Sequence, residues 1–143
     1  MFHKIMLAWD GSDNAVAAYR VAQDLASRYR ARLVAVSITH IPEHAERPGD
    51  KERALEEARS FYSGKLNSLV RGPRSPDIVV EHKVVPGDRP AETLIEYARR
   101  ESFDIIVIGR KRVERPPFFM IRGVTDRVVR NAPCPVLVAG RGE

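Results

Sequence analysis

Short apolar runs alternate along the chain with longer stretches in which apolar residues recur every three or four positions. The short runs, such as Ile105 to Ile108, are rich in β-branched residues and stop at turn residues, which is typical of strands buried on both faces. The longer stretches have the spacing of helices that bury one face. The pattern predicts strands at 4–8, 33–38, 78–85, 105–108 and 136–138, and helices at 14–29, 50–70, 90–101 and 124–130.

This alternation predicts an α/β fold, in which a parallel sheet carries helices on both faces. The third strand contains Glu81, His82 and Lys83, so we expect it at an edge of the sheet. A chain of 143 residues can bury the core of one domain. Because no repeat or linker interrupts the pattern, we predict a single domain over residues 1–143.

The composition is that of an ordinary globular protein, with 43% hydrophobic and 30% charged residues. No apolar run approaches the roughly 20 residues of a membrane span. The N-terminal sequence MFHKIMLAW is too short and too polar for a signal peptide, so we expect a cytoplasmic protein without a membrane partner.

The net charge of +5 permits a phosphate-bearing partner. Five cations fall in one segment between the fourth strand and the last helix: Arg110, Lys111, Arg112, Arg115 and Arg122. This segment lacks the interleaved aromatic residues of a base-stacking surface, and the chain has no recognition-helix motif. Nucleic-acid binding is therefore not expected.

The chain shows no Ser-His-Asp arrangement and no paired carboxylates typical of an active site. His40 and His82 have no second histidine or cysteine at ligand spacing, so we expect no metal site. Cys134 lies between two prolines without a nearby histidine and is interpreted as a small core residue. We predict a binding protein rather than a dedicated enzyme.

The end of the fourth strand marks a place for an anionic ligand. In an open parallel sheet, ligands bind where the carboxyl end of a strand meets a helix N-terminus. Here Ile108 and Gly109 end the strand, and Gly123 and Val124 begin the following helix. Asp10 ends the first strand, where its carboxylate can accept from ribose hydroxyls or cap the turn that follows.

Three parts of the chain resemble the universal stress protein family: KIMLAWDGSDNA at the start, VVPGDRPAETLIEYA in the middle, and DIIVIG with NAPCPVLVAG at the end. The resemblance covers nearly the whole chain. It implies a five-stranded doubly wound sheet in the order 3-2-1-4-5, a role in the stress response, and a homodimer formed through the last strand, Pro135 to Ala139. That strand also has the few charges of an edge that pairs with another chain.

One branch of this family binds ATP through the pattern G-x2-G-x9-G-[ST]. The spacing is kept from Gly109 onward, but Arg112 and Arg122 stand at the second and third glycine positions and Gly123 at the hydroxyl position. The glycines of such a loop let the backbone approach phosphate, and the arginines add side chains there. We therefore interpret the nucleotide site as degenerate.

Three alternatives remain open for this segment. The arginines can project away from an empty crevice, replace backbone amides as guanidinium donors to phosphate, or bind an acidic protein partner. In the second case the chain would be an ATP or AMP switch with slow ATP hydrolysis at most. The resemblance then implies that Asp10 contacts the ribose and Ile38 the base. The apolar run Phe118 to Ile121 would fill the crevice or contact a partner subunit.

Overall fold

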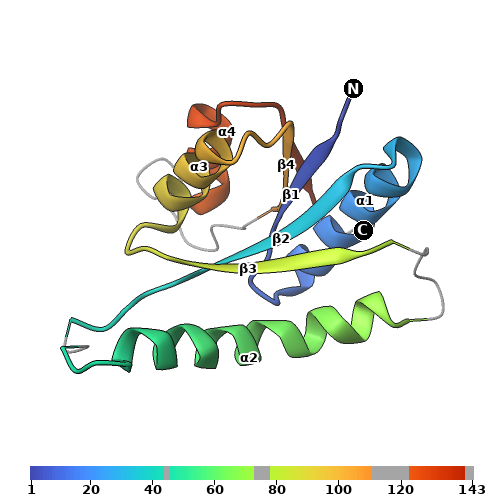
Figure 1. Cartoon of the computed structure of the whole chain (residues 1–143). Coiled ribbons are helices and arrows are strands. Elements are labelled where there is room, and N and C mark those ends of the chain that lie inside the picture. The colour runs from blue at the N-terminus through green and yellow to red at the C-terminus, as the bar shows by residue number, and fades with distance from the viewer. Residues whose placement is uncertain (44–45, 73–77, 111–122, 141–143) are drawn as a thin grey trace.

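The computed structural model describes residues 1–43, 46–72, 78–110 and 123–140 (Figure 1). Every predicted strand and helix is present in these ranges, and no end differs from the expected one by more than two residues. The elements are β1 (Lys4–Ala8), α1 (Asp13–Tyr29), β2 (Arg32–Thr39), α2 (Asp50–Val70), β3 (Val80–Pro86), α3 (Pro90–Arg100), β4 (Ile105–Gly109), α4 (Val124–Asn131) and β5 (Val136–Ala139).

The five strands form one parallel sheet in the order β3-β2-β1-β4-β5, which confirms the predicted fold class and strand order. β1 lies at the centre, where Met6 pairs with Val34 of β2 and Ile106 of β4. β3 lies at one edge, as its polar residues predicted, and β5 lies at the other. The carboxyl ends of all five strands therefore point to the same edge of the sheet.

The helices form two layers, with α1 and α2 on one face of the sheet and α3 and α4 on the other (Figure 1). Alternate residues of β1 enter different cores, because successive side chains of a strand point to opposite faces. Ile5 and Leu7 pack under α1 and α2, whereas Met6 packs under α3. None of the helices in the described ranges has both the length and the apolar character needed to cross a membrane.

α1 begins at an N-cap, Ser12. Ser12 Oγ accepts from the backbone N–H of Ala15 at 3.1 Å, which satisfies one amide of the first turn. The face of α1 toward the sheet is built mostly from small residues: Ala15, Ala18, Tyr19, Ala22 and Ala26 are buried. Small side chains let the helix axis approach the strands closely, and this positions the β1–α1 turn against β4.

Two apolar residues that the helical pattern assigns to buried faces are exposed. Phe61 of α2 is 79% exposed and Val129 of α4 is 50% exposed. Leu66 is the only buried residue of α2, because this helix lies along β3 at the edge of the sheet, where the surface to be covered is narrow. The predicted apolar faces of these two helices were therefore too wide.

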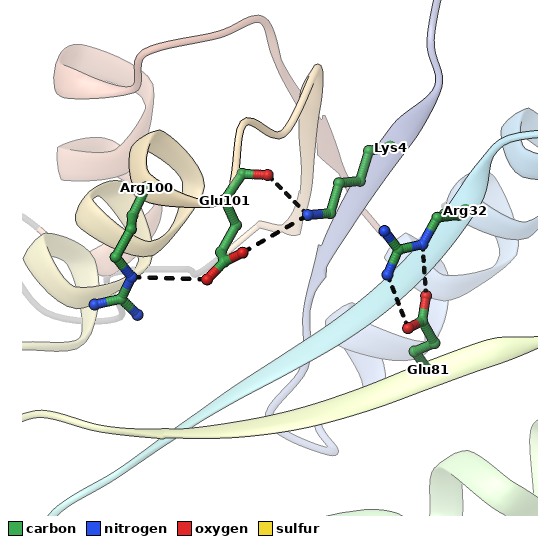
Figure 2. A network of polar contacts seen from close by, with 5 residues as sticks. All are labelled: Lys4, Arg32, Glu81, Arg100 and Glu101. Atoms are coloured by element: carbon green, nitrogen blue, oxygen red, sulfur yellow. Dashed lines mark hydrogen bonds and ion pairs between the residues drawn. The ribbon is translucent and has the colours of Figure 1, made fainter.

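Ion pairs join neighbouring strands at the amino end of the sheet, opposite the carboxyl edge (Figure 2). Arg32 donates from Nη2 and Nε to the Glu81 carboxylate at 2.9 and 3.0 Å, and so connects β2 with β3. The hydrogen bond from Arg32 lowers the pKa of Glu81. Lys4 Nζ donates to the carbonyl of Glu101 at 2.7 Å and connects β1 with the end of α3. These groups are paired with one another, so we place the candidate ligand site at the other edge.

Candidate functional site

The β1–α1 turn carries Asp10 at the carboxyl edge of the sheet. The Asp10 side chain is exposed, and its Oδ1 accepts from the backbone N–H of Ser12 at 2.9 Å. Gly11 has φ of +80°, a conformation that L side chains rarely adopt. The turn therefore holds the Asp10 carboxylate in a fixed place at the solvent side of β1.

α2 holds this turn from the other side. The Trp9 indole is 2% exposed, and its Nε1 donates to the carbonyl of Tyr62 at 2.8 Å. Lys65 Nζ donates to the carbonyl of Gly11 at 2.9 Å and lies 3.7 Å from Asp13 Oδ1. Trp9 is thus a packing residue, and a movement of α2 would move the turn that carries Asp10.

Gly109 ends β4 directly beneath the first turn of α1. A Cβ at this position would lie 2.6 Å from both the carbonyl carbon and the carbonyl oxygen of Asn14, and 3.0 Å from the Ala15 nitrogen. Contacts under 3.0 Å with backbone atoms do not occur for real Cβ atoms. The packing of α1 on β4 therefore requires glycine at position 109, whatever ligand the crevice binds.

Two side chains that the sequence analysis did not select hold the backbone just before segment 111–122. Asn14 Nδ2 donates to the carbonyl of Arg110, and Thr125 Oγ1 donates to the carbonyl of Gly109 at 2.8 Å. The backbone N–H of Arg110 donates to the carbonyl of Ala139 at 2.8 Å. The side chains of Asn14 and Thr125 donate to main-chain carbonyls that are far away in sequence. Only the presence of a polar residue at the start of each helix could have indicated these contacts.

The N-terminus of α4 lies beside the end of β4, where Thr125 contacts Gly109. Its N-cap is Gly123, which has no side chain to accept from the first-turn amides. Free amides and the helix dipole favour an anion at such an end. Asp126 adds a carboxylate to the same turn, and Arg130 pairs with it at 3.1 Å. In the described part of the chain no side chain caps the start of α4, at Gly123 and Val124, and the Asp126 carboxylate partly offsets the attraction of this helix end for an anion.

The remaining predicted site residues divide into two groups. Ile108 is 5% exposed, and Ile38 is half-buried, and both contribute to the core under α3 and α4. The structure therefore brings Asp10, Gly109 and the start of α4 to one edge, while the two isoleucines form the core behind it. Arg112, Arg122 and the run Phe118 to Ile121 lie outside the described residues.

The cysteine and one histidine considered in the sequence analysis, Cys134 and His40, form no part of a metal site in the described residues. Cys134 is half-buried, and burial raises the pKa of its thiol, with a smaller contribution from the charge of Asp104. His40 Nδ1 lies 2.6 Å from Asp88 Oδ1, and both side chains are exposed beyond the ends of β2 and β3. Across the described ranges, no three His, Cys, Asp or Glu residues are grouped so that they could bind a metal ion.

Comparison with known proteins identifies a family that matches this chain. A family model described as the Universal stress protein family matches residues 1–140. A curated relative from Thermus aquaticus, named as the universal stress protein in the QAH/OAS sulfhydrylase 3′ region, is 32% identical over an aligned length of 142 residues, and the alignment covers 96% of this chain and 98% of the relative.

Two solved structures with the same fold are complexes with nucleotides. One is a universal stress protein in complex with cAMP, with a TM-score of 0.69 and 19% identity, covering 96% of this chain and 97% of that one. The other is a universal stress protein family protein from Arabidopsis thaliana with AMP bound, with a TM-score of 0.63 and 15% identity, covering 98% and 92%. At these identities the likeness concerns the fold.

Proposed function

Because the chain belongs to the universal stress protein family, we propose that it is a cytoplasmic, homodimeric regulatory module of the stress response that acts by binding. Its nucleotide site is degenerate, with G-x2-R-x9-R-G in place of G-x2-G-x9-G-[ST]. In the ATP-binding branch, glycines let the loop backbone surround the triphosphate, and this chain has arginine at two of those glycine positions. The module therefore signals through its partners, and its own catalysis is at most a slow ATP hydrolysis.

The observation that carries this proposal is the contact between Gly109 and α1. Gly109 is the one position of the pattern where glycine is kept in register, and the 2.6 Å approach to Asn14 explains it by packing alone. Its retention is therefore no sign of phosphate binding. Positions 112 and 122, where the ATP-binding pattern has its other two glycines, are both arginine in this chain.

The homodimer is proposed through β5. This strand pairs with β4 on one side only, and it lies at the edge of the sheet. Val138 is 41% exposed and Val136 is half-buried, so the edge offers apolar side chains together with backbone groups that pair with no second strand of the described residues. A second copy pairing along the segment Pro135 to Ala139 would cover both.

A second candidate function is an adenine-nucleotide switch, and a different observation favours it. The start of α4 has a glycine cap without a side-chain acceptor, and Asp10 remains exposed at the same edge of the sheet. Two solved structures of the same fold are complexes with cAMP or AMP. In this alternative, Asp10 would contact the ribose of ATP or AMP, Ile38 would face the base, and Arg112 and Arg122 would bind the phosphates.

Calorimetric titration separates the two candidates. The purified protein is first checked by mass spectrometry for nucleotide that co-purifies, and is then titrated with ATP and AMP. The degenerate site predicts no binding of ATP with a micromolar Kd. Micromolar binding that is lost in Asp10→Ala and Arg122→Ala, and kept in the exposed control Arg20→Ala, would establish the switch instead.

A further inference from the structure

The side chain of Ser37 on β2 is fully buried. Its Oγ lies 2.8 Å from the carbonyl of Trp9 and 3.0 Å from Nε2 of His82. A carbonyl can only accept, so the single hydroxyl proton of Ser37 goes to Trp9. Ser37 Oγ must then accept from His82, and the proton of the imidazole therefore resides on Nε2.

This assignment leaves Nδ1 of His82 as a bare acceptor. The atom is buried, and it bonds to no polar group in the described part of the chain. A second proton on Nδ1 would find no acceptor there, and the resulting cation would lose its hydration. Burial lowers the pKa of His82, and the positive charge of Arg59 lowers it further.

The charged groups around the imidazole come from two elements. Arg59 of α2 faces it, and Arg59 is itself paired with Glu56 at 3.1 Å. Glu81 and Lys83, the neighbours on β3, alternate to the opposite face of the sheet, where Glu81 pairs with Arg32. β2 contributes only the neutral hydroxyl of Ser37. No described carboxylate is therefore placed to stabilise a protonated His82.

The network continues from Trp9 to the helix that holds the site. Trp9 donates from Nε1 to the carbonyl of Tyr62 on α2, and the next residue in the chain is Asp10. His82, Ser37, Trp9 and Tyr62 thus form a buried polar network that connects β3, β2, the end of β1 and α2. The network joins the edge strand to the turn that carries the candidate ligand carboxylate.

We propose that this buried polar network is an acid-sensitive switch: a proton taken up from solvent by His82 Nδ1 releases α2 and the Asp10 turn from the sheet. His82 then turns toward solvent as an imidazolium, while Ser37 keeps its bond to Trp9. The bond from Trp9 to Tyr62 of α2 and the bond from Lys65 of α2 to Gly11 of the turn loosen. One proton is bound for each opening. The switch itself does not depend on the proposed function; only its consequence for ligand binding at Asp10 rests on that function.

The sign of the effect follows from linkage. A histidine whose pKa is lower in the closed state than in the open state favours closure fully above its ordinary pKa of about 6.5, and this preference is lost as the pH falls below that value. Between the pKa of His82 in the closed state and its pKa in the open state, the equilibrium constant for opening rises by up to about tenfold for each unit by which the pH falls. Acidification therefore opens the network, and neutral pH closes it.

The test uses Trp9, the single tryptophan of the chain, as an internal reporter. Its fluorescence emission and the NMR resonance of its indole N–H are followed from pH 8 to pH 5 without any ligand. The switch predicts a transition below about pH 6.5 in which the emission moves to longer wavelength and the indole proton exchanges faster. His82→Gln keeps a donor toward Ser37 but cannot titrate, so its curve is expected to be flat.

The matched controls are His40→Gln and His3→Gln, since both histidines are exposed and lie away from the network. Both variants should keep the wild-type transition. An unchanged transition in His82→Gln, or its loss in a control, overturns the proposal. The wild-type protein gives an independent check, because the ¹⁵N shifts of His82 report its tautomer. A proton on Nδ1, or a His82 pKa at or above the ordinary value, also overturns it.

Discussion

Gly109 of β4 lies so close to Asn14 of α1 that a Cβ on the glycine would come within 2.6 Å of the Asn14 carbonyl. This contact sets the distance between the sheet and the helix at the edge where the candidate site lies. The contact also explains, by packing, why the first position of the nucleotide pattern is glycine. Packing alone therefore accounts for glycine at this position, with or without a ligand at the edge of the sheet.

We predict that Gly109→Ala destabilises the protein by about 1–3 kcal/mol, because the added methyl group overpacks a backbone contact that cannot yield. Urea unfolding at neutral pH measures the change. The matched control is Gly64→Ala in α2, where a Cβ would have no heavy atom within 4 Å. There, alanine should stabilise by roughly 0.5–1 kcal/mol through its helix propensity. Equal effects of the two substitutions would contradict the packing role of Gly109.

The N-terminal strand predicts an acid-dependent loss of stability. Asp104 Oδ2 accepts from the backbone N–H groups of His3 and Lys4 at 2.6 and 2.8 Å, and these bonds lower its pKa. Its contribution is present above the ordinary carboxyl pKa and is lost as the pH falls through the lowered value. Asp104→Asn should therefore be less stable than the wild type at pH 7, and the difference should shrink below about pH 4.

The measurement is the free energy of unfolding of both proteins between pH 7 and pH 2. Asp24→Asn is the matched control, because this exposed carboxylate pairs with Arg28 on its own helix. We expect little change from it. A constant difference between wild type and Asp104→Asn at all pH values would show that the pair of backbone bonds does not depend on the charge.

The edge strand β5 predicts the oligomeric state. If the homodimer forms through this strand, a lysine at position 138 places a charge in the middle of the paired edge. Val138→Lys should shift the protein from dimer to monomer in sedimentation experiments at micromolar concentration. The control is Val79→Lys beside the opposite edge, where the valine is 84% exposed. A wild-type monomer, or a dimer unchanged by Val138→Lys, would exclude β5 as the interface.

The order of the elements and of the strands was predictable because it depends on short-range patterns and on a family resemblance. Ile105 to Ile108 is apolar without interruption and became a buried central strand, while the charges of β3 correctly indicated an edge. The exposure of Phe61 was not predictable, because the helical period shows which residues share a face and not how much sheet that face finds to cover.

The site was predictable only in part, for a related reason. Asp10 and Gly109 stand at strand ends, and a parallel sheet brings such ends together. The contacts of Asn14, Lys65 and Thr125 are made with backbone carbonyls, which leave no trace in the identity of the partner residue. The buried network of His82 was missed because a serine and a histidine on neighbouring strands have no sequence spacing that marks them as partners.

The most direct test of the degenerate site is to restore the ATP-binding pattern. The triple variant Arg112→Gly, Arg122→Gly, Gly123→Ser recreates G-x2-G-x9-G-S at the spacing that the chain has kept. Its ATP affinity is compared with that of the wild type by calorimetric titration, with AMP as the reference ligand. The account predicts that the wild type shows no micromolar binding of ATP and that the variant gains it. Micromolar binding of ATP by the wild type, weakened in the variant, would show that the arginines bind phosphate and would contradict the account.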